Sequence, residues 1–459
     1  MQFISNLNMF KKKHYHELSP TRLIVVSFLG VIICGSLLLM LPFATVDGKL
    51  GIVDAFFTAT SATCVTGLIV FDTYTKFTLF GQVIILMLIQ VGGLGLVTLT
   101  SFLNVAIGRR MGFKSMKLAS ESISTSDASQ AGKLLEFVMK VALTFEAAGA
   151  ILLAFVFVPQ FGSAGMFISV FIAISAFCNA GFDILGRLGA YGSLVPYFEN
   201  TYVLTIIALL IISGGLGFIV WFDIANFRKN KHLRLHSKIV LGMTAFLILF
   251  GTLGFLILEW NNPATLAPMS IFHKVTNSAF QSVSARTAGF NSVDLAQISN
   301  VTKLFVSVLM FIGAAPGGTG GGIKVTTLSV IMLTVSSTIQ GRAEATVRGR
   351  RIDQKTVYKS IAIFMLSAIA VIAAALTVFY NSGPEINEMS SVFESVSAFA
   401  TVGLSVGVTG VMNNTAKIVT MLTMFIGRVG PVSLAITLST KHNDNANREV
   451  MPDARIVVG

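Results

Sequence analysis

The chain has 459 residues, of which 54% are hydrophobic and only 12% are charged, and its net charge is +12. A soluble protein carries about 25% charged residues, so this composition excludes a soluble fold and indicates an integral membrane protein. The positive charge does not indicate a nucleic-acid-binding protein, because 23 of the 33 lysines and arginines gather in five segments between apolar stretches. The cysteines, Cys34, Cys64 and Cys178, lack the spacing of a metal site or a disulfide framework.

Eight segments approach the length of about 20 apolar residues that a membrane-spanning helix needs. In chain order they are Leu23–Leu41, Phe80–Thr100, Phe137–Val158, Tyr202–Trp221, Ile239–Leu258, Leu304–Thr334 with a break, Ile361–Phe379 and Ile418–Leu438. The first is expected to be a span and not a cleaved signal peptide, because its 19 residues are uncharged and no cleavage pattern follows it.

The five basic segments lie on one side of the membrane if two spans separate each segment from the next. They are the N-terminus to Arg22, residues 105–133, 226–240 and 340–360, and the tail from Lys441. By the positive-inside rule this side is the cytoplasm, with both termini there. A basic face that attracts anionic lipid is a second interpretation, compatible with the first.

One short pattern occurs four times: Ser-Ala, three or four residues, Gly, and then Leu or Phe. The copies are SATCVTGL from Ser61, SAFCNAGF from Ser175, SARTAGF from Ser284 and SAFATVGL from Ser397. The third copy is one residue shorter, so an ungapped alignment shares only the glycine and a small residue five before it. The glycines, Gly67, Gly181, Gly289 and Gly403, lie 114, 108 and 114 residues apart. This near-even spacing predicts one module used four times.

Each copy follows an apolar stretch that is too short to cross a membrane and is typical of a re-entrant segment. These stretches are Asp54–Thr63, Met166–Phe177, Phe272–Val283 and Ser391–Phe399. Irregular backbone at membrane depth must be buried or line water, so we expect four loops around one axis. Short helices that point their negative C-terminal ends at a cavity, followed by loops that offer carbonyls, form a cation pore. A single glycine of this kind could instead serve tight helix packing. The occurrence of four such glycines in register disfavours this alternative.

The selectivity filter is expected at four segments that act mainly through main-chain oxygens: Thr63–Gly67, Phe177–Gly181, Ala285–Gly289 and Phe399–Gly403. Its residues are Thr63, Cys64, Val65, Thr66 and Gly67; Cys178, Asn179, Ala180 and Gly181; Arg286, Thr287, Ala288 and Gly289; and Ala400, Thr401, Val402 and Gly403. Since side chains differ between copies, the ring is expected to be only pseudo-fourfold. Arg286 would repel a cation from inside the pore, so we expect it to point outward and brace the filter against an acid of a short helix such as Glu394.

The sixth span contains the sequence FIGAAPGGTGGGIKVTT from Phe311 to Thr327. Glycine costs a helix about 1 kcal/mol and proline about 3 kcal/mol relative to alanine, so the span must open into a loop. A nucleotide-binding Walker A loop is disfavoured because Ile323 separates the last glycine from Lys324 and no hydrophilic domain surrounds it. We expect an intramembrane gate at Gly313, Ala314, Ala315, Pro316, Gly317, Gly318, Thr319, Gly320, Gly321, Gly322 and Lys324, together with Arg428 of the last span. Arg428 is either an electrostatic barrier or a hydrogen-bonding anchor for loop carbonyls.

These motifs resemble those of the Trk/Ktr/HKT superfamily of potassium transporters, over about Thr21 to Thr440. Only the fourth copy keeps a Thr-Val-Gly run, at Thr401–Gly403. With eight spans and no extra N-terminal pair, the chain is most similar to the membrane subunit of Ktr systems. The resemblance implies an all-α integral membrane protein of four covalently linked M1–pore-loop–M2 repeats with pseudo-fourfold symmetry. It also implies a gate at Gly313–Lys324, a barrier at Arg428, a homodimer, a cytoplasmic ring of nucleotide-binding regulatory subunits, and sodium stimulation.

The resulting organisation is a cytoplasmic tail at 1–21, pore repeats at 22–110, 130–230, 235–345 with the gating loop 313–327, and 355–440, and a cytoplasmic tail at 441–459. The expected function is potassium uptake across the plasma membrane, with potassium held by main-chain atoms of Gly67, Gly181, Gly289 and Gly403, sodium as an activator and no covalently bound cofactor. Glycine at position 67 favours potassium, because a serine there accompanies sodium preference in the plant branch. The alternatives are a sodium-selective or nonselective transporter, a scaffold for the regulatory ring, and a membrane enzyme. An enzyme is disfavoured because most of the six histidines lie in tails and inner loops, and His273 has no partner at motif spacing.

Overall fold

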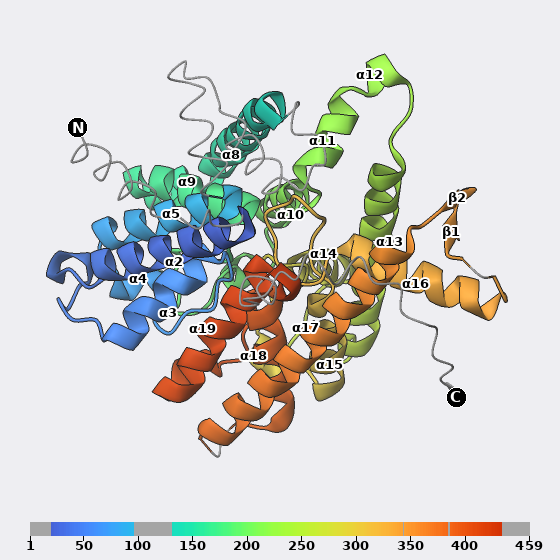
Figure 1. Cartoon of the computed structure of the whole chain (residues 1–459). Helices are drawn as coiled ribbons and strands as arrows, with labels where there is room; N and C mark the ends of the chain where they lie inside the picture. Colours follow the sequence, from blue (N-terminus) through green and yellow to red (C-terminus); the bar gives the residue numbers. More distant parts are fainter. Residues whose placement is uncertain (1–19, 96–130, 343, 384–385, 434–459) are drawn as a thin grey trace, which may run out of the picture.

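Four groups of helices surround a common centre (Figure 1). A computed structural model describes residues 20–95, 131–342, 344–383 and 386–433. Each group has a first helix, a short central helix and a third helix. The first two groups are α2 Pro20–Leu39, α3 Ile52–Thr63 and α5 Leu79–Leu94, then α8 Ala131–Phe161, α9 Ser163–Phe177 and α10 Thr201–Gly215. The last two are α13 Leu235–Glu259, α14 Ile271–Ser284 and α15 Asn300–Phe311, then α17 Gln354–Asn381, α18 Glu388–Ala400 and α19 Asn414–Val429.

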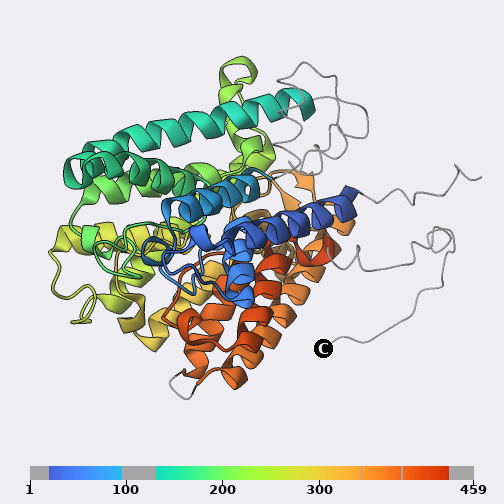
Figure 2. The ribbon, with the colours of Figure 1, turned by 90° about the vertical axis from the view of Figure 1, so that its left-hand side faces the viewer.

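Smaller elements lie in the connections within and between these groups. They are the helices α4 Thr73–Lys76, α11 Phe218–Ala225, α12 Phe227–Asn230 and α16 Val325–Ile339, and the 3-10 turns Pro42–Ala44, Val195–Tyr197, Leu295–Gln297 and Thr409–Val411. The strands β1 Thr346–Val347 and β2 Arg350–Arg351 form an antiparallel hairpin between α16 and α17. In Figure 2, α2 and α8 begin and α19 ends on the same side of the molecule, where this hairpin also lies.

Side-chain caps determine where several helices begin. Asn387 accepts a hydrogen bond from the Ser390 amide at the start of α18, at 2.8 Å. Asn413 accepts one at the start of α19, at 2.9 Å, and Asn200, Ser270 and Ser299 cap α10, α14 and α15 in the same way. Such caps satisfy amides that have no partner within the helix. The chain can therefore begin a helix directly after a loop.

The C-terminal parts of the four short central helices are buried, whereas the four long helices expose apolar surface. Residues Phe57–Thr63 of α3 and Phe393–Ala400 of α18 are fully within the interior. By contrast, only 28% of the apolar stretch of each of α2, α8, α13 and α17 is buried. Exposed apolar patches of this size are unfavourable in water. The long helices therefore surround the short ones and face lipid, as expected for a multi-pass, all-helical membrane protein.

Four of the eight expected spans are single helices long and apolar enough to cross a membrane: α2, α8, α13 and α17. The fourth expected span is bent by 94° between α10 and α11. The sixth is broken into α15 and α16, as its glycines predicted. The second and eighth are represented by α5 and α19, and their remainders, 96–100 and 434–438, lie outside the described residues. So do residues 105–130 of the basic segment 105–133, residues 1–19 of the expected N-terminal tail, and the whole expected tail 441–459. The number of eight spans stays a prediction.

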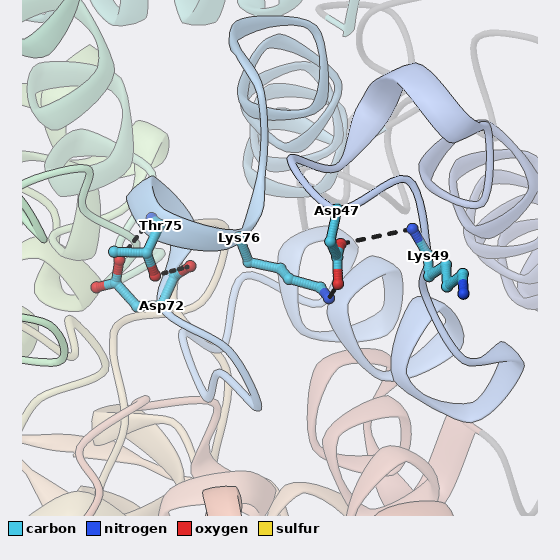
Figure 3. Close-up of polar contacts among 5 residues, drawn as sticks. All are labelled: Asp47, Lys49, Asp72, Thr75 and Lys76. Atoms are coloured by element: carbon cyan, nitrogen blue, oxygen red, sulfur yellow. Dashed lines mark hydrogen bonds and ion pairs between the residues drawn. The ribbon is translucent and has the colours of Figure 1, made fainter.

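Two ion pairs involve residues of the first group, and they differ in exposure. Lys76 of α4 lies 2.7 Å from Asp47 (Figure 3), and this contact lowers the pKa of the exposed Asp47 carboxyl below its usual value. Figure 3 also shows Asp72 capping α4 through the Thr75 amide. The second pair is Lys417 of α19 with Asp54 of α3, also at 2.7 Å, with only 11% and 19% of the two side chains exposed. This pair connects the last group of helices to the first.

We expect Lys417→Met to destabilise the protein by about 3 kcal/mol, because breaking a buried pair leaves an uncompensated charge. The measurement is thermal unfolding of purified protein in detergent. The double variant Lys417→Met with Asp54→Leu should recover part of the loss, because no unpaired charge remains. Lys76→Gln is the matched control, and it should unfold close to the parent since its partner Asp47 is solvated. An equal loss in Lys76→Gln and Lys417→Met would contradict this account.

Candidate functional site

The four motif glycines lie together at the centre of the fold. A β-carbon added to Gly67 would lie 2.5 Å from the carbonyl oxygen of Ala180 and 3.1 Å from the α-carbon of Gly181. One added to Gly181 would lie 2.8 Å from the Ala288 carbonyl oxygen and 2.9 Å from the α-carbon of Gly289. No side chain fits at either position. The first three loops are therefore in backbone contact at their glycines.

The remaining contacts close this chain of glycines into a ring. A β-carbon on Gly289 would lie 2.5 Å from the Val402 carbonyl oxygen and 3.3 Å from the α-carbon of Gly403. One on Gly403 would overlap the Thr66 carbonyl and lie 2.9 Å from the α-carbon of Gly67. In each loop, the carbonyl just before the glycine faces the glycine of the adjacent loop. Segments far apart in sequence thus place four backbone carbonyls around one centre.

The backbone of the four loops has the same unusual conformation. All four glycines have positive φ, at 93°, 70°, 82° and 89° in chain order. The residues two positions earlier also have positive φ, at 57° for Val65, 59° for Asn179, 73° for Thr287 and 50° for Thr401. This conformation costs a non-glycine residue about 1–2 kcal/mol, so surrounding contacts must maintain it. The sequence pattern revealed the glycines but not these four strained residues.

One backbone hydrogen bond recurs in every loop and explains the leading serine of the motif. The amide before each glycine donates to the carbonyl of the motif serine: Thr66 to Ser61 at 2.8 Å, Ala180 to Ser175 at 2.7 Å, Ala288 to Ser284 at 2.9 Å, and Val402 to Ser397 at 2.8 Å. The shorter third copy makes the same bond with one residue fewer. The turn of the third loop is therefore one residue shorter, and its glycine still follows the residue that makes this bond.

The serine hydroxyls bond to the loops as well, in two ways. Ser61 and Ser397 accept hydrogen bonds from the amides of Gly67 and Gly403, both at 3.1 Å. Ser175 and Ser284 instead donate to the carbonyls that follow the glycine, those of Phe182 and Phe290. In each case the hydroxyl satisfies a backbone group that the strained loop leaves without a regular partner.

A second layer of glycines packs against the outside of the ring. Gly92 of α5, Gly214 of α10 and Gly427 of α19 lie directly against the carbonyls of Thr63, Phe177 and Phe399, so close that a β-carbon would overlap them. The touched residues all lie four positions before a motif glycine. The sequence analysis did not identify this second layer. Its glycines could have been found from their spacing, because Gly92, Gly214 and Gly427 follow Gly67, Gly181 and Gly403 by 25, 33 and 24 residues.

The other expected filter residues lie behind the ring, and their side chains are buried. Cys64 and Cys178 cap α3 and α9, and both are fully buried. The sulfur of Cys178 lies 3.8 Å from a carboxylate oxygen of Glu146, whose two oxygens accept hydrogen bonds from Gln90 at 3.1 Å. Ala400 lies against Gly322 of the glycine-rich loop. The cysteines therefore fill space between the loops and the outer helices.

Arg286 points away from the ring, but its expected partner is wrong. Its guanidinium donates to the carbonyl and hydroxyl oxygens of Thr244 on α13, at 3.5 and 3.4 Å. Glu394 instead accepts hydrogen bonds within its own group, from Ser405 at 2.9 Å and from Thr409. Arg286 is therefore held by the outer helix α13, whereas Glu394 is held by the segment that follows the fourth loop, so the two side chains do not meet.

The loop between α15 and α16 lies against the ring and the end of α10. Its base is closed by a bond from the Gly313 amide to the Ile323 carbonyl, at 2.8 Å. The amides of Ala315 and Thr319 bond to the carbonyls of Gly215 and Gly214, at 3.0 and 3.2 Å. A third amide, that of Gly321, donates to the Thr401 hydroxyl at 3.0 Å. The whole expected stretch Gly313–Lys324 is thereby brought next to the glycine ring.

Both expected cations donate hydrogen bonds to backbone carbonyls of or beside this loop. Lys324 donates to the carbonyls of Gly320 at 2.5 Å and Gly321 at 3.2 Å. Arg428 donates to the Thr319 carbonyl of the loop and to the Gly92 carbonyl at the end of α5. Neither cation forms an ion pair with any residue in the described part of the chain. Arg428 therefore connects three elements: the loop, α5 and its own helix α19.

We expect Gly427→Ala to destabilise the protein by about 1–3 kcal/mol, because the added methyl overlaps backbone atoms that cannot rotate away. The measurement is thermal unfolding in detergent. Gly410→Ala is the matched control, since a β-carbon there meets nothing within 4 Å. Equal stability of the two variants would show that the close approach of α19 to the Phe399 carbonyl is not needed.

Comparisons with known proteins agree with this architecture. Residues 6–450 match the family model of TrkH, described as a cation transport protein. The potassium/sodium uptake protein NtpJ of Enterococcus hirae is 36% identical over 99% of this chain and 100% of its own length. The Ktr system potassium uptake protein B is 37% identical in Bacillus subtilis, over 96% of this chain and 97% of the relative, and 39% identical in Vibrio alginolyticus, over 91% of each.

A solved structure is similar in fold at lower sequence identity. The crystal structure of the potassium transporter TrkH from Vibrio parahaemolyticus superposes with a TM-score of 0.71, at 20% identity, over 94% of this chain and 87% of that one. The family match covers nearly the whole chain, as do the three relatives. The chain belongs to the TrkH family of cation transport proteins.

Proposed function

We propose that this protein takes up potassium through the ring formed by Gly67, Gly181, Gly289 and Gly403. The observation that carries the proposal is the closed chain of contacts between these glycines, with a backbone carbonyl from each loop facing the next. Rings of backbone carbonyls replace the hydration shell of potassium in selective pores. The names of the relatives, which describe potassium or potassium/sodium uptake, support the same substrate.

The filter in this proposal comprises the four segments expected from sequence, Thr63–Gly67, Phe177–Gly181, Ala285–Gly289 and Phe399–Gly403. Their positive-φ residues and shared serine bonds support one repeated function. We propose four pore repeats at 22–110, 130–230, 235–345 and 355–440, with eight spans and pseudo-fourfold symmetry. The bent pair α10 and α11, and the broken pair α15 and α16, would each count as one span.

The basic segments would face the cytoplasm of a plasma-membrane protein, with both termini on that side. The shared position of the start of α2, the start of α8, the end of α19 and the hairpin supports this orientation (Figure 2). Lysine and arginine accumulate in cytoplasmic loops of membrane proteins. The glycine ring would then be entered from the opposite side.

The loop 313–324 would act as an intramembrane gate. Its position against Thr287 and Thr401 of the ring supports this role. Lys324 and Arg428 would hold the loop through its carbonyls and also oppose cation passage by their charge. In this arrangement the two interpretations of Arg428, as an anchor and as a barrier, are one mechanism.

The partners in the proposal are a second copy of the chain and a cytoplasmic ring of nucleotide-binding regulatory subunits. Three relatives are named as Ktr system potassium uptake proteins, which supports a membrane subunit that works with other components. Sodium would stimulate transport. A sodium-selective or nonselective transporter is the second candidate, because one relative is named a potassium/sodium uptake protein.

The filter assignment is tested with Gly67→Ser in proteoliposomes. We expect rubidium uptake to fall about tenfold and its preference over sodium to weaken. A serine at φ +93° is strained, and its β-carbon would lie 2.5 Å from the Ala180 carbonyl oxygen. Gly410→Ser, at an open position, is the control. Unchanged selectivity in Gly67→Ser would remove the filter assignment, and sodium uptake above rubidium uptake by the parent would favour the second candidate.

The gate assignment is tested by deleting Gly317 and Gly318. The shortened loop loses the bond from the Phe218 amide to the Gly317 carbonyl, and it no longer reaches Arg428 in the same position. We expect a several-fold rise in rubidium flux without any regulatory subunit, since a loop that blocks the path would be withdrawn. Deletion of Gly383, in the connection before α18, is the control. Flux that stays at the parent level would argue against a gate.

A further inference from the structure

A groove between α13 and α16 lies on the outside of the molecule, apart from the ring and its loop. It has a volume of about 390 Å³. Its walls are apolar, and the lining consists of Leu235, Lys238, Ile239, Gly242, Met243, Phe246, Ser329, Met332, Leu333, Val347 and Arg348. Besides its two cations, Ser329 is its only polar side chain, and this hydroxyl already donates to the Val325 carbonyl at 2.7 Å. The apolar wall therefore offers no unsatisfied polar group to an occupant.

Two cations, Lys238 of α13 and Arg348 of the hairpin, line this groove. Both side chains are exposed, and no carboxylate of the described residues forms an ion pair with either. The neighbouring acids are already paired. Glu344 lies 2.7 Å from Arg351, and Asp223 accepts a hydrogen bond from the Arg234 amide at 2.7 Å.

The hairpin holds Arg348 at its tip, beside α16 (Figure 1). Thr346 pairs with Arg351 and Val347 with Arg350, so Arg348 and Gly349 form a two-residue turn. Both have positive φ, at 47° and 76°. Such turns favour asparagine and glycine, and an arginine in the first position is strained by about 1–2 kcal/mol. The fold thus presents a cation at a place where a smaller residue would be more stable.

The apolar wall faces the lipid. α13 is one of the four helices long and apolar enough to cross a membrane. Phe246 of α13 and Met332 of α16 are 53% and 50% exposed. Lys238 lies in the first turn of α13 and Phe246 two turns further along it. A cationic end and an apolar wall therefore occur at the depths where a phospholipid has its headgroup and its acyl chain.

We propose that this groove binds one anionic phospholipid, with its phosphate between Lys238 and Arg348 and an acyl chain along Ile239, Met243 and Phe246. Charge complementarity selects this occupant, because an unpaired cationic pair and an apolar wall match an anionic amphiphile. The proposal does not depend on which ion the protein transports.

The test uses purified full-length protein in detergent, titrated with phosphatidylglycerol or phosphatidylcholine, with bound lipid counted by native mass spectrometry. The parent should retain phosphatidylglycerol in preference to phosphatidylcholine. The variant Lys238→Gln with Arg348→Gln should weaken phosphatidylglycerol retention about thirtyfold, because each cation near a membrane surface contributes to anionic lipid binding. Lys355→Gln with Lys359→Gln removes two exposed cations from the start of α17, outside the groove, and should retain the preference.

A second variant blocks the apolar part without disturbing the protein. A β-carbon on Gly242 meets nothing within 4 Å, so Gly242→Leu projects into the groove and should abolish retention of the bound lipid. Gly30→Leu, at an equally open position in α2, should not. Thermal unfolding of all variants confirms that they are folded.

Three results would overturn the proposal. The first is equal retention of the two lipids by the parent, and the second is undiminished phosphatidylglycerol retention in either groove variant. The third is a shift from dimer to monomer in Gly242→Leu with lipid retention unchanged, which would assign the groove to a second copy of the chain.

Discussion

The rest of the structure depends on the backbone contact of four loops at their glycines. Because each α-carbon touches the next loop, no side chain can be accommodated, and the spacing of the four loops is set by backbone atoms alone. The same constraint continues outward. The carbonyls of Thr63, Phe177 and Phe399 are themselves in contact with glycines of α5, α10 and α19. The ring glycines therefore fix the distances between the loops, and the glycines of α5, α10 and α19 fix the distances from the loops to these three helices.

The glycine-rich loop places many backbone polar groups in the interior of the protein. Such groups must be satisfied within the protein. Here two cations and the ends of neighbouring elements do so: Lys324 and Arg428 donate to loop carbonyls, while Gly214 and Gly215 accept from loop amides. The charges are therefore bonded to dipoles and not to acids. In the proposed gate, any movement of the loop would break these bonds together, which gives the closed arrangement its cooperativity.

The external groove and the loop share an element. α16 begins at Val325, directly after Lys324, and it forms one wall of the groove. The proposed lipid would therefore contact the helix that continues from the proposed gate. The ion pair of Lys417 with Asp54 likewise lies outside the ring, where it connects α19 of the last group to α3 of the first.

The sequence by itself determined the class of protein, the short central helices, the break in the sixth span and the four glycines that meet. Each of these depends on local properties, namely apolar length, helix-breaking residues and a recurring small-residue pattern. Only the tertiary structure decided which groups satisfy one another. Arg286 bonds to Thr244 and not to Glu394, and Val65, Asn179, Thr287 and Thr401 adopt positive φ. These outcomes depend on contacts between residues of different segments, 42 positions apart for Arg286 and Thr244, or on strain imposed by neighbours, and no local pattern records either.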